Sequence, residues 1–365
     1  MGNDEKILEV GSVSQQRVAA YGALVKQLHI LIFSAKKVPA QQIGNVFIYS
    51  SGGCCRLLAL LKGYFLAKKI IVQNQIDLVS TQDPFESAQV AFWLKKRYVV
   101  RINIQIHGDF FSNNSWKKQR WFNSIRYRQA VCNLKRADSI RVVSTRVRKS
   151  LIEKFKIASD KIVVAPIYSD FSRFGKFQRD PASLKRDKQF IFLTVSRLTR
   201  EKNLAMVLRA FAKLRKSDRQ VVLQIVGVGA KKKNLERLAK KLKIQDRVQF
   251  LGWLDKEELA QQYSKADCFL LASDFEGWGL AALEAAYFAL PIVMTDVGCC
   301  GEILKPGRDV LSAVPRDERG FTAAMQRVLD DDGLRADLGR NAKAALGKLP
   351  NREQTLELYK RAWFL

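Results

Sequence analysis

Short apolar runs recur along the whole chain, separated by amphipathic stretches. The runs have the length of strands, and the stretches between them, such as "KNLERLAKKLKI", have the apolar spacing of helices. This alternation predicts parallel sheets covered by helices on both faces. The expected strands are residues 6–10, 29–34, 45–50, 77–81, 101–107, 139–144 and 161–166 in the first half, and 189–196, 221–227, 247–252, 268–273, 291–296 and 310–314 in the second.

Thirteen strands are more than a single sheet usually contains, which favours two doubly wound α/β domains. The segment 168–188 is polar, contains Gly175 and Pro181, and has no strand pattern. We therefore expect an N-terminal domain over residues 1–172 and a C-terminal domain over 173–350. Residues 351–365 have the pattern of an amphipathic helix, which we expect to pack back on the first domain.

No apolar run approaches the roughly 20 residues that a membrane-spanning helix needs. The start, "MGNDEKILEV", contains acidic residues and lacks the apolar core of a secretory signal. The six cysteines do not have the spacing of metal ligands, and the chain has only two histidines, His29 and His107. We expect reduced thiols, no metal and no cofactor, in a cytoplasmic protein.

The net charge is +28, and residues 1–175 carry more of it than the rest of the chain. A basic surface indicates an anionic partner, such as nucleic acid, an anionic membrane or a phosphorylated substrate, although solubility alone is an alternative. Two basic segments, 55–72 and 116–138, are interleaved with large apolar or aromatic residues. They are typical of helices at an anionic membrane surface, or of core helices with a solvated basic face.

The stretch "DFEGWGLAALEAA" (274–286) places Glu276 and Glu284 eight residues apart. The pattern predicts a loop at Glu276 and a helix from about Leu280 to Phe288, whose N-terminus suits a phosphate. Eight helical residues span about 12 Å, beyond the roughly 5–9.5 Å between paired glycosidase carboxylates. The spacing favours two ends of one extended ligand over a shared proton transfer, with ordinary helix charges as the alternative.

The stretch "FEGWGLAALEAAYFALPIVMTDVGCCGEIL" resembles the E-x7-E signature of the retaining glycosyltransferases of family 4, which have the two-domain GT-B fold. "LTVSRLTREKNL" (193–204) is similar to the family's Arg and Lys loop, and residues 223–273 are similar to its nucleotide-side segment. The resemblance covers 188–350 almost completely and the earlier residues more loosely. It implies a two-domain enzyme that takes a hexosyl group from a nucleotide-diphospho-sugar, UDP- or GDP-linked.

The resemblance also implies a role for each matching position of the C-terminal half. Glu276 would hold hydroxyls of the donor sugar and Glu284 those of the ribose, because carboxylates accept paired O–H donors. Arg197 and Lys202 would stabilise the diphosphate in place of a metal ion. The diphosphate would face backbone N–H groups of Trp278, Gly279 and Leu280. A further set would approach the nucleotide and its base: Gly227, Phe250 and Leu251, with Gly229 beside them.

In the N-terminal half, "QIHGDFF" (105–111) resembles the family's His-Gly element beside the donor sugar. The resemblance implies that His107 is a positioning and polar residue beside the donor sugar, and not an obligatory base. It also implies that Asp109 contacts the acceptor. The alternative is that both residues belong to a simple turn. The family's glycine-rich loop after the first strand is reduced to Gly11-Ser12. We still expect Gly11 to approach the diphosphate. The family's Asn-Gly in the linker is Tyr168-Ser169 here.

The function expected from this resemblance is metal-independent hexosyl transfer with retention. The acceptor would be lipid-linked or a polysaccharide, in cell-envelope biosynthesis, with the enzyme peripheral at the inner face of the membrane. One alternative is a sugar-nucleotide epimerase or phosphorylase of the same fold, although the sequence has no motif for a pyridoxal phosphate lysine. The other is a basic nucleic-acid-binding protein, for which no recognition motif is found.

Overall fold

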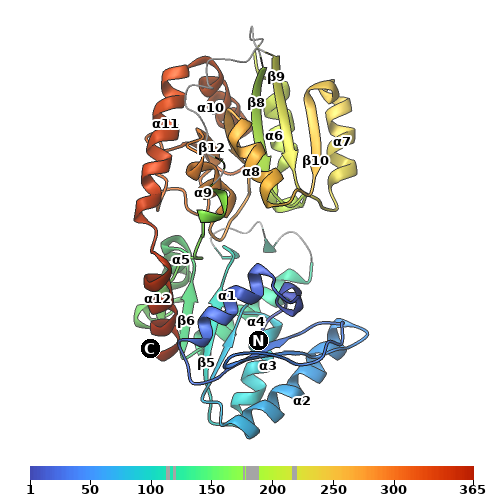
Figure 1. The fold of residues 1–365 in the computed structure, drawn as a ribbon, viewed down its shortest axis with the longest axis vertical. Coiled ribbons are helices and arrows are strands. Elements are labelled where there is room, and N and C mark those ends of the chain that lie inside the picture. Colours follow the sequence, from blue (N-terminus) through green and yellow to red (C-terminus); the bar gives the residue numbers. More distant parts are fainter. Residues whose placement is uncertain (112–115, 118–120, 176, 178–188, 216–219) are drawn as a thin grey trace. The chain divides into compact units, whose positions relative to one another are not determined.

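The computed structural model of the protein describes residues 1–111, 116–117, 121–175, 177, 189–215 and 220–365 (Figure 1). Contacts divide the chain into two units. The first unit contains Met1–Ile167 and Pro350–Leu365, and the second contains Tyr168–Leu349. The expected boundary between residues 172 and 173 lies five residues beyond this one. Both units are α/β, built largely from parallel strands, so the expected fold class is confirmed.

The second unit alternates strands and helices along most of its length. Its strands are β8 (Gln189–Val195), β9 (Gln220–Val226), β10 (Val248–Gly252), β11 (Cys268–Leu271), β12 (Ile292–Thr295) and β13 (Leu311–Ala313). Its α-helices are α6 (Leu204–Ala212), α7 (Lys232–Lys241), α8 (Lys256–Lys265), α9 (Leu280–Tyr287), α10 (Glu318–Asp330) and α11 (Asp332–Ala345). Its 3-10 turns are η4 (Ser172–Phe174), η6 (Arg200–Lys202), η7 (Gln245–Arg247) and η8 (Leu346–Lys348).

The six strands of the second unit form one parallel sheet in the order β10-β9-β8-β11-β12-β13. Helices begin where the sequence supplies caps: Asp255 and Glu258 form a capping box at α8, and Asp317 and Asp331 cap α10 and α11. Buried strand residues such as Phe192 pack with helix residues such as Phe211 in one large core. This core fixes the carboxyl edge of the sheet, where ligands of open α/β sheets bind.

The first unit also alternates strands and helices, but its strands are shorter. Its strands are β1 (Leu28–Ile32), β2 (Gln41–Ile43), β3 (Val46–Ser50), β4 (Leu78–Thr81), β5 (Arg101–Ile106), β6 (Ser139–Val142) and β7 (Ile162–Val164). Its helices are η1 (Glu5–Leu8), α1 (Val13–Gly22), α2 (Arg56–Asn74), α3 (Glu86–Lys95), α4 (Asn123–Arg136), α5 (Thr145–Phe155), η3 (Ser159–Lys161) and α12 (Arg352–Phe364).

The strands of the first unit form two sheets, not one. One has the order β1-β3-β2 and the other β4-β5-β6-β7. All pairs are parallel except β2–β3, an antiparallel pair that the sequence pattern did not predict. The expected strand at residues 6–10 is wrong, because Asp4 caps a 3-10 turn at Glu5–Leu8 by accepting a hydrogen bond from the Lys6 N–H.

The C-terminal helix α12 belongs to the first unit. Asn351 and Gln354 start it with a capping box. The Ala362 carbonyl near its end accepts hydrogen bonds from Asn103 on β5 (2.9 Å) and Ser139 on β6 (2.8 Å). Tyr359 stacks on Tyr21 of α1, with ring centroids 4.6 Å apart. The helix therefore ties α1 to the four-stranded sheet.

Candidate functional site

Glu276 lies in the loop after β11, as the sequence pattern predicted, and is the centre of a polar cluster in the second unit. Its Oε1 accepts a hydrogen bond from Ser273 (2.8 Å) and is paired with the Lys202 ammonium. Both side chains are mostly buried, with 13% exposure for Glu276 and 16% for Lys202. A charged pair held at the carboxyl edge of a parallel sheet is well placed to bind a polar ligand.

Asp274 fixes the loop that carries Glu276. Its carboxylate accepts hydrogen bonds from Asn203 (3.1 Å) and Arg316 (2.6 Å), and its N–H donates to the Glu201 carbonyl (2.8 Å). Asn203 and Arg316 both have a positive φ, which residues other than glycine seldom adopt. These contacts join the loops after β8, β11 and β13, so Lys202 reaches Glu276 from a fixed backbone.

Arg197 is placed differently from Lys202, although both lie in the loop after β8. The Arg197 side chain is 76% exposed and has an ion pair with Glu201 at 3.5 Å. The carboxylate of Glu201 also accepts a hydrogen bond from Thr199 (2.7 Å). The guanidinium therefore lies in solvent with one ion pair, whereas the Lys202 ammonium is mostly buried against Glu276.

The Gly-Trp-Gly turn leads into α9. Gly279 has a φ of +85° and caps the helix, so a glycine suits this position. In the described residues, the N–H groups of Gly279 and Leu280 have no intramolecular acceptor, and they open the positive end of the helix. The Trp278 indole, in contrast, is 2% exposed and belongs to the core, so only the backbone of Trp278 is available to a ligand.

Glu284 lies within α9, where its Oε2 accepts a hydrogen bond from the Tyr263 hydroxyl (2.9 Å). Tyr263 is a buried residue of α8, and its hydroxyl also reaches the Ala281 carbonyl at 3.3 Å. The two glutamates thus sit on a loop and on a helix, with separate partners. Each of the two carboxylates therefore has a hydrogen-bond partner of its own.

Gly227 and Gly229, after β9, are required by the packing of two loops. A Cβ on Gly227 would lie 1.9 Å from the Ser196 carbonyl oxygen, and one on Gly229 would lie 2.5 Å from that of Leu198. The backbone of this loop therefore rests on the loop after β8. Phe250 and Leu251 lie next to it on β10, partly buried, and Phe250 packs against the main core.

In the first unit, His107 follows β5 and lies between two polar side chains. A guanidinium only donates hydrogen bonds, so the Arg141 contact at 3.2 Å requires Nδ1 of His107 to accept. Nε2 then carries the proton and donates to Gln82 Oε1 at 2.8 Å. Burial, with the Arg141 and Arg17 charges, holds the pKa of His107 well below its ordinary value. The imidazole is therefore neutral, and its one lone pair is occupied.

The other predicted residues of the first unit have unlike environments. Asp109 is buried just after His107. Gly11 has a φ of +76° and open space around it, and its N–H donates to Gln15 Oε1 (2.8 Å). Ser12 caps α1 by accepting from the Gln15 N–H. Gly11 is therefore a turn glycine at the start of a helix.

Several partners of the predicted residues were not found from the sequence, and four of them bond to predicted side chains near the proposed reaction or ribose positions. They are Ser273 and Tyr263 in the second unit, and Gln82 and Arg141 in the first. Ser273 could have been found, because it follows β11 at the edge that binds ligands. The others lie far from their partners in the chain, and no local pattern connects them.

No helix among the described residues is both long and apolar enough to cross a bilayer. Nor do the described residues contain a cluster of three or more histidine, cysteine, aspartate or glutamate side chains able to hold a metal ion.

Both units match families of known proteins. Residues 176–345 match the family described as glycosyl transferases group 1, and residues 23–168 match glycosyltransferase family 4. Glycogen synthase of Mycobacterium tuberculosis is 32% identical over 216 residues, which are 59% of this chain and 50% of that protein. Alpha-monoglucosyldiacylglycerol synthase of Streptococcus pneumoniae is 26% identical over 242 residues, 64% of this chain and 54% of that protein.

The chain spans about half the length of the curated relatives that it matches. Among solved structures, sucrose-phosphate synthase from Thermosynechococcus elongatus has a TM-score of 0.79 at 21% identity, covering 95% of this chain and 92% of that chain. The two units and this likeness define a GT-B fold. Each half of the chain is thus similar to glycosyltransferases.

Proposed function

We propose that the protein transfers a hexosyl group from a nucleotide-diphospho-sugar, UDP- or GDP-linked, to a glycan or lipid-linked acceptor. The transfer retains the configuration of the sugar and uses protein cations where other enzymes use a metal ion. The matches of both units to glycosyltransferase families support the class of reaction. The acceptor classes follow from relatives named as a glycogen synthase and an alpha-monoglucosyldiacylglycerol synthase.

The observation that carries the proposal is the arrangement at the carboxyl edge of the second unit's sheet. The Lys202–Glu276 pair lies in loops that Asp274 anchors, and the N-cap of α9, Gly279, follows Glu276 by three residues. A nucleotide sugar offers hydroxyls for a carboxylate and a diphosphate for a cation and free N–H groups. The edge supplies these groups on one rigid scaffold.

In the proposed complex, the donor replaces contacts that the side chains now make with each other. Sugar hydroxyls donate to Glu276, and the Lys202 ammonium turns to the diphosphate, which also lies against the N–H groups of Gly279 and Leu280. Arg197 swings in from solvent. These positive groups stabilise the nucleoside diphosphate as it leaves with increasing negative charge. Ribose hydroxyls donate to Glu284, which Tyr263 orients.

Retention in a single transfer step requires that the acceptor attack the face of the sugar from which the nucleotide leaves. We propose that an oxygen of the leaving phosphate takes the proton of the acceptor hydroxyl. His107, neutral and with its lone pair held by Arg141, serves as a polar positioning group in the first unit. Asp109 contacts the acceptor.

A thermal-shift screen tests the donor site. UDP- and GDP-sugars are added singly to the wild type, to Glu284→Gln and to Glu257→Gln, a matched change on the exposed face of α8. A bound donor raises the melting temperature by mass action. We expect a shift in the wild type and in Glu257→Gln, and a much smaller one in Glu284→Gln. Absence of any shift in the wild type, or an equal shift in Glu284→Gln, would reject the proposed site.

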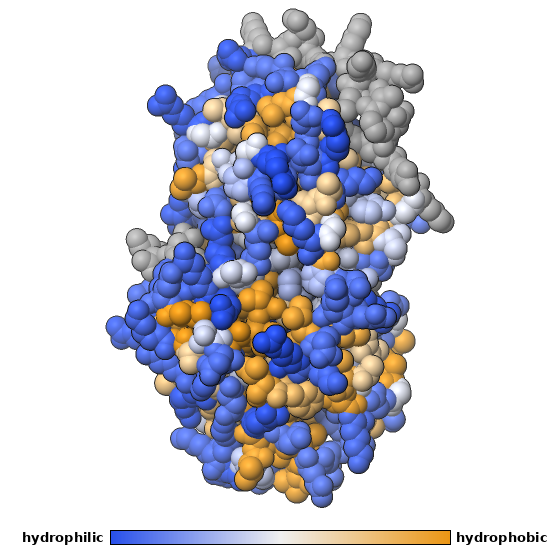
Figure 2. Space-filling model, turned by 90° about the vertical axis from the view of Figure 1, so that its left-hand side faces the viewer, coloured by the Kyte–Doolittle hydropathy of each residue, from blue (hydrophilic) through white to orange (hydrophobic). Residues whose placement is uncertain are grey.

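An exposed stripe on α2 supports contact with a membrane that presents a lipid-linked acceptor. Leu57, Leu61 and Phe65, at four-residue spacing, have exposed side chains. Lys68 continues the same helix face, and Lys62 and Lys69 flank it. Figure 2 shows a different face of the first unit from the one that carries α2, and apolar residues gather there too, in the lower part of the picture.

The second basic segment, 116–138, divides into a buried and an exposed part. Trp116 stacks on Phe85 in the interior, with ring centroids 4.9 Å apart, whereas Trp121 and Ile125 are exposed. Residues 118–120 of this segment lie outside the described residues.

Vesicle sedimentation tests the contact. We expect anionic vesicles to bind the protein at low salt and neutral vesicles not to, because basic residues and an apolar stripe act together at such a surface. Phe65→Asp should weaken the binding, and Glu153→Asp, a change at an exposed position of α5, should not. Equal binding to both kinds of vesicle would reject the proposal.

A further inference from the structure

Arg141 is a buried cation of the first unit. It lies on β6, opposite Gln105 of β5, and is 0% exposed. Among the described residues no carboxylate is paired with its guanidinium, and its Nε and Nη2 have no hydrogen-bond partner. Burial of a charge without a counter-charge costs free energy of folding. Stability alone therefore does not explain an arginine at this position.

The ring of Tyr359, on helix α12, supports this guanidinium. The central carbon of the guanidinium lies 4.4 Å from the ring centroid, a distance at which a cation is attracted to the face of an aromatic ring. The same ring stacks on Tyr21 of α1. Helix α12 is itself bonded to β5 and β6 through the Ala362 carbonyl. The guanidinium therefore rests on a platform that two helices and two strands hold in place.

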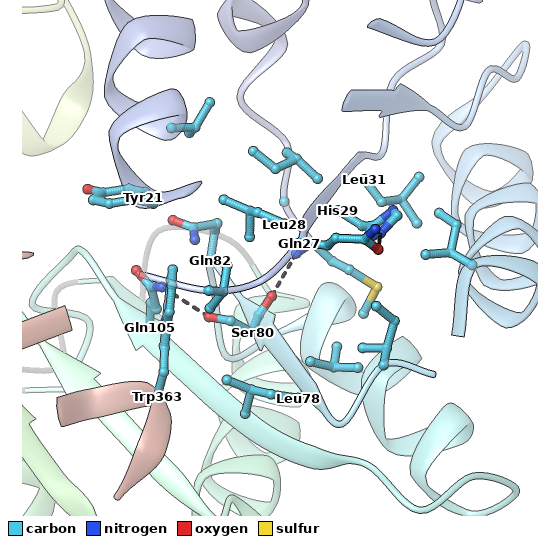
Figure 3. Close-up of a pocket in the computed structure, with 18 of the residues that line it drawn as sticks. Tyr21, Gln27, Leu28, His29, Leu31, Leu78, Ser80, Gln82, Gln105 and Trp363 are labelled. Atoms are coloured by element: carbon cyan, nitrogen blue, oxygen red, sulfur yellow. Dashed lines mark hydrogen bonds between the residues drawn. The ribbon is translucent and has the colours of Figure 1, made fainter. Parts of the chain in front are cut away.

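Gln105 directs the same guanidinium from β5. Its side-chain nitrogen donates to the Ser80 hydroxyl of β4 (3.0 Å; Figure 3), so its side-chain oxygen is left to accept from Nη1 of Arg141, at 3.5 Å. The Ser80 hydroxyl donates in turn to Asn103 (2.9 Å), whose amide donates to the Ala362 carbonyl of α12. Arg141 is thus part of a polar network that spans β4, β5 and β6.

The network ends at His107. Nη1 of Arg141 donates to Nδ1 of the imidazole, on its buried side, at 3.2 Å. Nε2 meets Gln82 on the exposed side of the ring, at 2.8 Å. Gln82 and His107 both line a cavity of about 790 Å³ in the first unit. A ligand atom that takes the place of Gln82 therefore meets an N–H, because the hydrogen bond at one ring nitrogen decides which nitrogen carries the proton.

We propose that Arg141 is a positioning residue, which holds His107 in one orientation and in the tautomer that carries its proton on Nε2. The imidazole then donates a hydrogen bond from its exposed side and cannot take up a proton there. Without Arg141, the ring is free to turn over or to move its proton to Nδ1. The inference rests on the proposed function only for the atom that the Nε2–H binds, an oxygen of a substrate.

Nitrogen-15 NMR of histidine-labelled protein reads this tautomer. The spectrum of His107→Gln assigns the signals, because His29 is the only other histidine in the sequence. We expect a single tautomer, protonated on Nε2, in the wild type, and loss of this signature in Arg141→Met. Arg136→Met is the matched control, because the guanidinium of Arg136 also lies 4.4 Å from a ring centroid, that of Phe92, in the same unit. It should keep the wild-type signature.

A second pair of variants tests the aromatic platform. Tyr359→Leu removes the ring and should also lose the single-tautomer signature, whereas Tyr359→Phe keeps the ring and should retain it. Initial rates give the functional readout. The kcat of Arg141→Met should fall roughly tenfold to hundredfold, the cost of a misplaced group near the reaction, and that of Arg136→Met should not change. Melting temperatures check that each variant is folded.

The outcomes separate this inference from the proposed function. An unchanged signature in Arg141→Met, or a wild type protonated on Nδ1, would overturn the inference whatever the activity. An unchanged kcat in Arg141→Met, with the signature lost, would overturn the positioning role. A wild type that shows the single tautomer but transfers no sugar would reject the proposed function, while supporting the hold of Arg141 on His107.

Discussion

The two units have similar strand and helix patterns but differ in how complete their sheets are. The second unit joins six strands in one hydrogen-bonded sheet, and the first divides seven strands between two sheets. In the second unit, loops after three strands are tied together at Asp274. In the first, a cavity lies between the two sheets, and α1 follows an exposed turn glycine. A continuous sheet is what holds several loops in one fixed arrangement.

The largest effect should come from the cation that the second unit holds in place. Lys202→Met removes the ammonium paired with Glu276 while keeping much of the side-chain length. If the second unit alone supplies the diphosphate cations, transfer should slow by roughly 10²–10³-fold, the cost of losing one electrostatic stabiliser. Initial rates with donor and acceptor measure this, and circular dichroism checks the fold. A loss below tenfold would break the proposed division of roles.

Next in size is the loss of stability expected at the loop contact after β9. Gly227→Ala places a Cβ 1.9 Å from a backbone oxygen at a φ of +130°, so the backbone must move. The free energy of unfolding of the second unit should fall by roughly 3 kcal/mol. Gly347→Ala is the matched control, because nothing lies within 4 Å of its added Cβ. Denaturant unfolding measures both, and equal stabilities would contradict the role given to this contact.

The pH dependence of stability should differ between the two units. The Met1 amino group in the first unit has a pKa of about 6 when folded and 8.0 as its ordinary value. The unfolded chain therefore binds more protons between pH 6 and 8, and stability must rise with pH across this window, by about 2 kcal/mol. The nearby Asp83 charge opposes the shift. The lowered pKa of His107 acts in the same direction below pH 6.5.

Denaturant unfolding at several pH values, with a fluorescent probe on each unit, measures this effect. Acetylation of the amino group should flatten the dependence between pH 7 and 8. His107→Gln should flatten only the part at lower pH. A pH dependence confined to the second unit would contradict the comparison.

The smallest effect should come from Tyr263→Phe, which removes the hydroxyl that bonds to Glu284. We expect donor affinity to fall by about fivefold to tenfold, or roughly 1 kcal/mol, the value of one typical hydrogen bond, because the hydroxyl orients Glu284 and does not itself contact the ribose. The Km for donor should rise while kcat changes little, because the ribose does not react. Isothermal titration and initial rates check this split. A fall in kcat with an unchanged Km would contradict the ribose role and place Glu284 nearer the reacting atoms.

The sequence predicted the second unit more fully than the first. The strands between residues 189 and 313 and the helix from Leu280 lie close to where the pattern placed them. Each local signal agrees with the tertiary structure there. The strand expected at 6–10 is a capped turn, since Asp4 offers the backbone a local hydrogen bond. The short strand β2 pairs on one side only, and its three residues are too few to show a period.

The sequence by itself determined the α/β class, the loop at Glu276 and helix at Glu284, and the helical nature of residues 351–365. These depend on periodicity and caps, which act within a few residues. The tertiary structure alone decided that Lys202 meets Glu276, that Arg197 is left in solvent, that the Trp278 indole is core and that the first unit's sheet is divided. Each of these depends on chain segments far apart in sequence, whose approach is fixed by packing and by strand pairing.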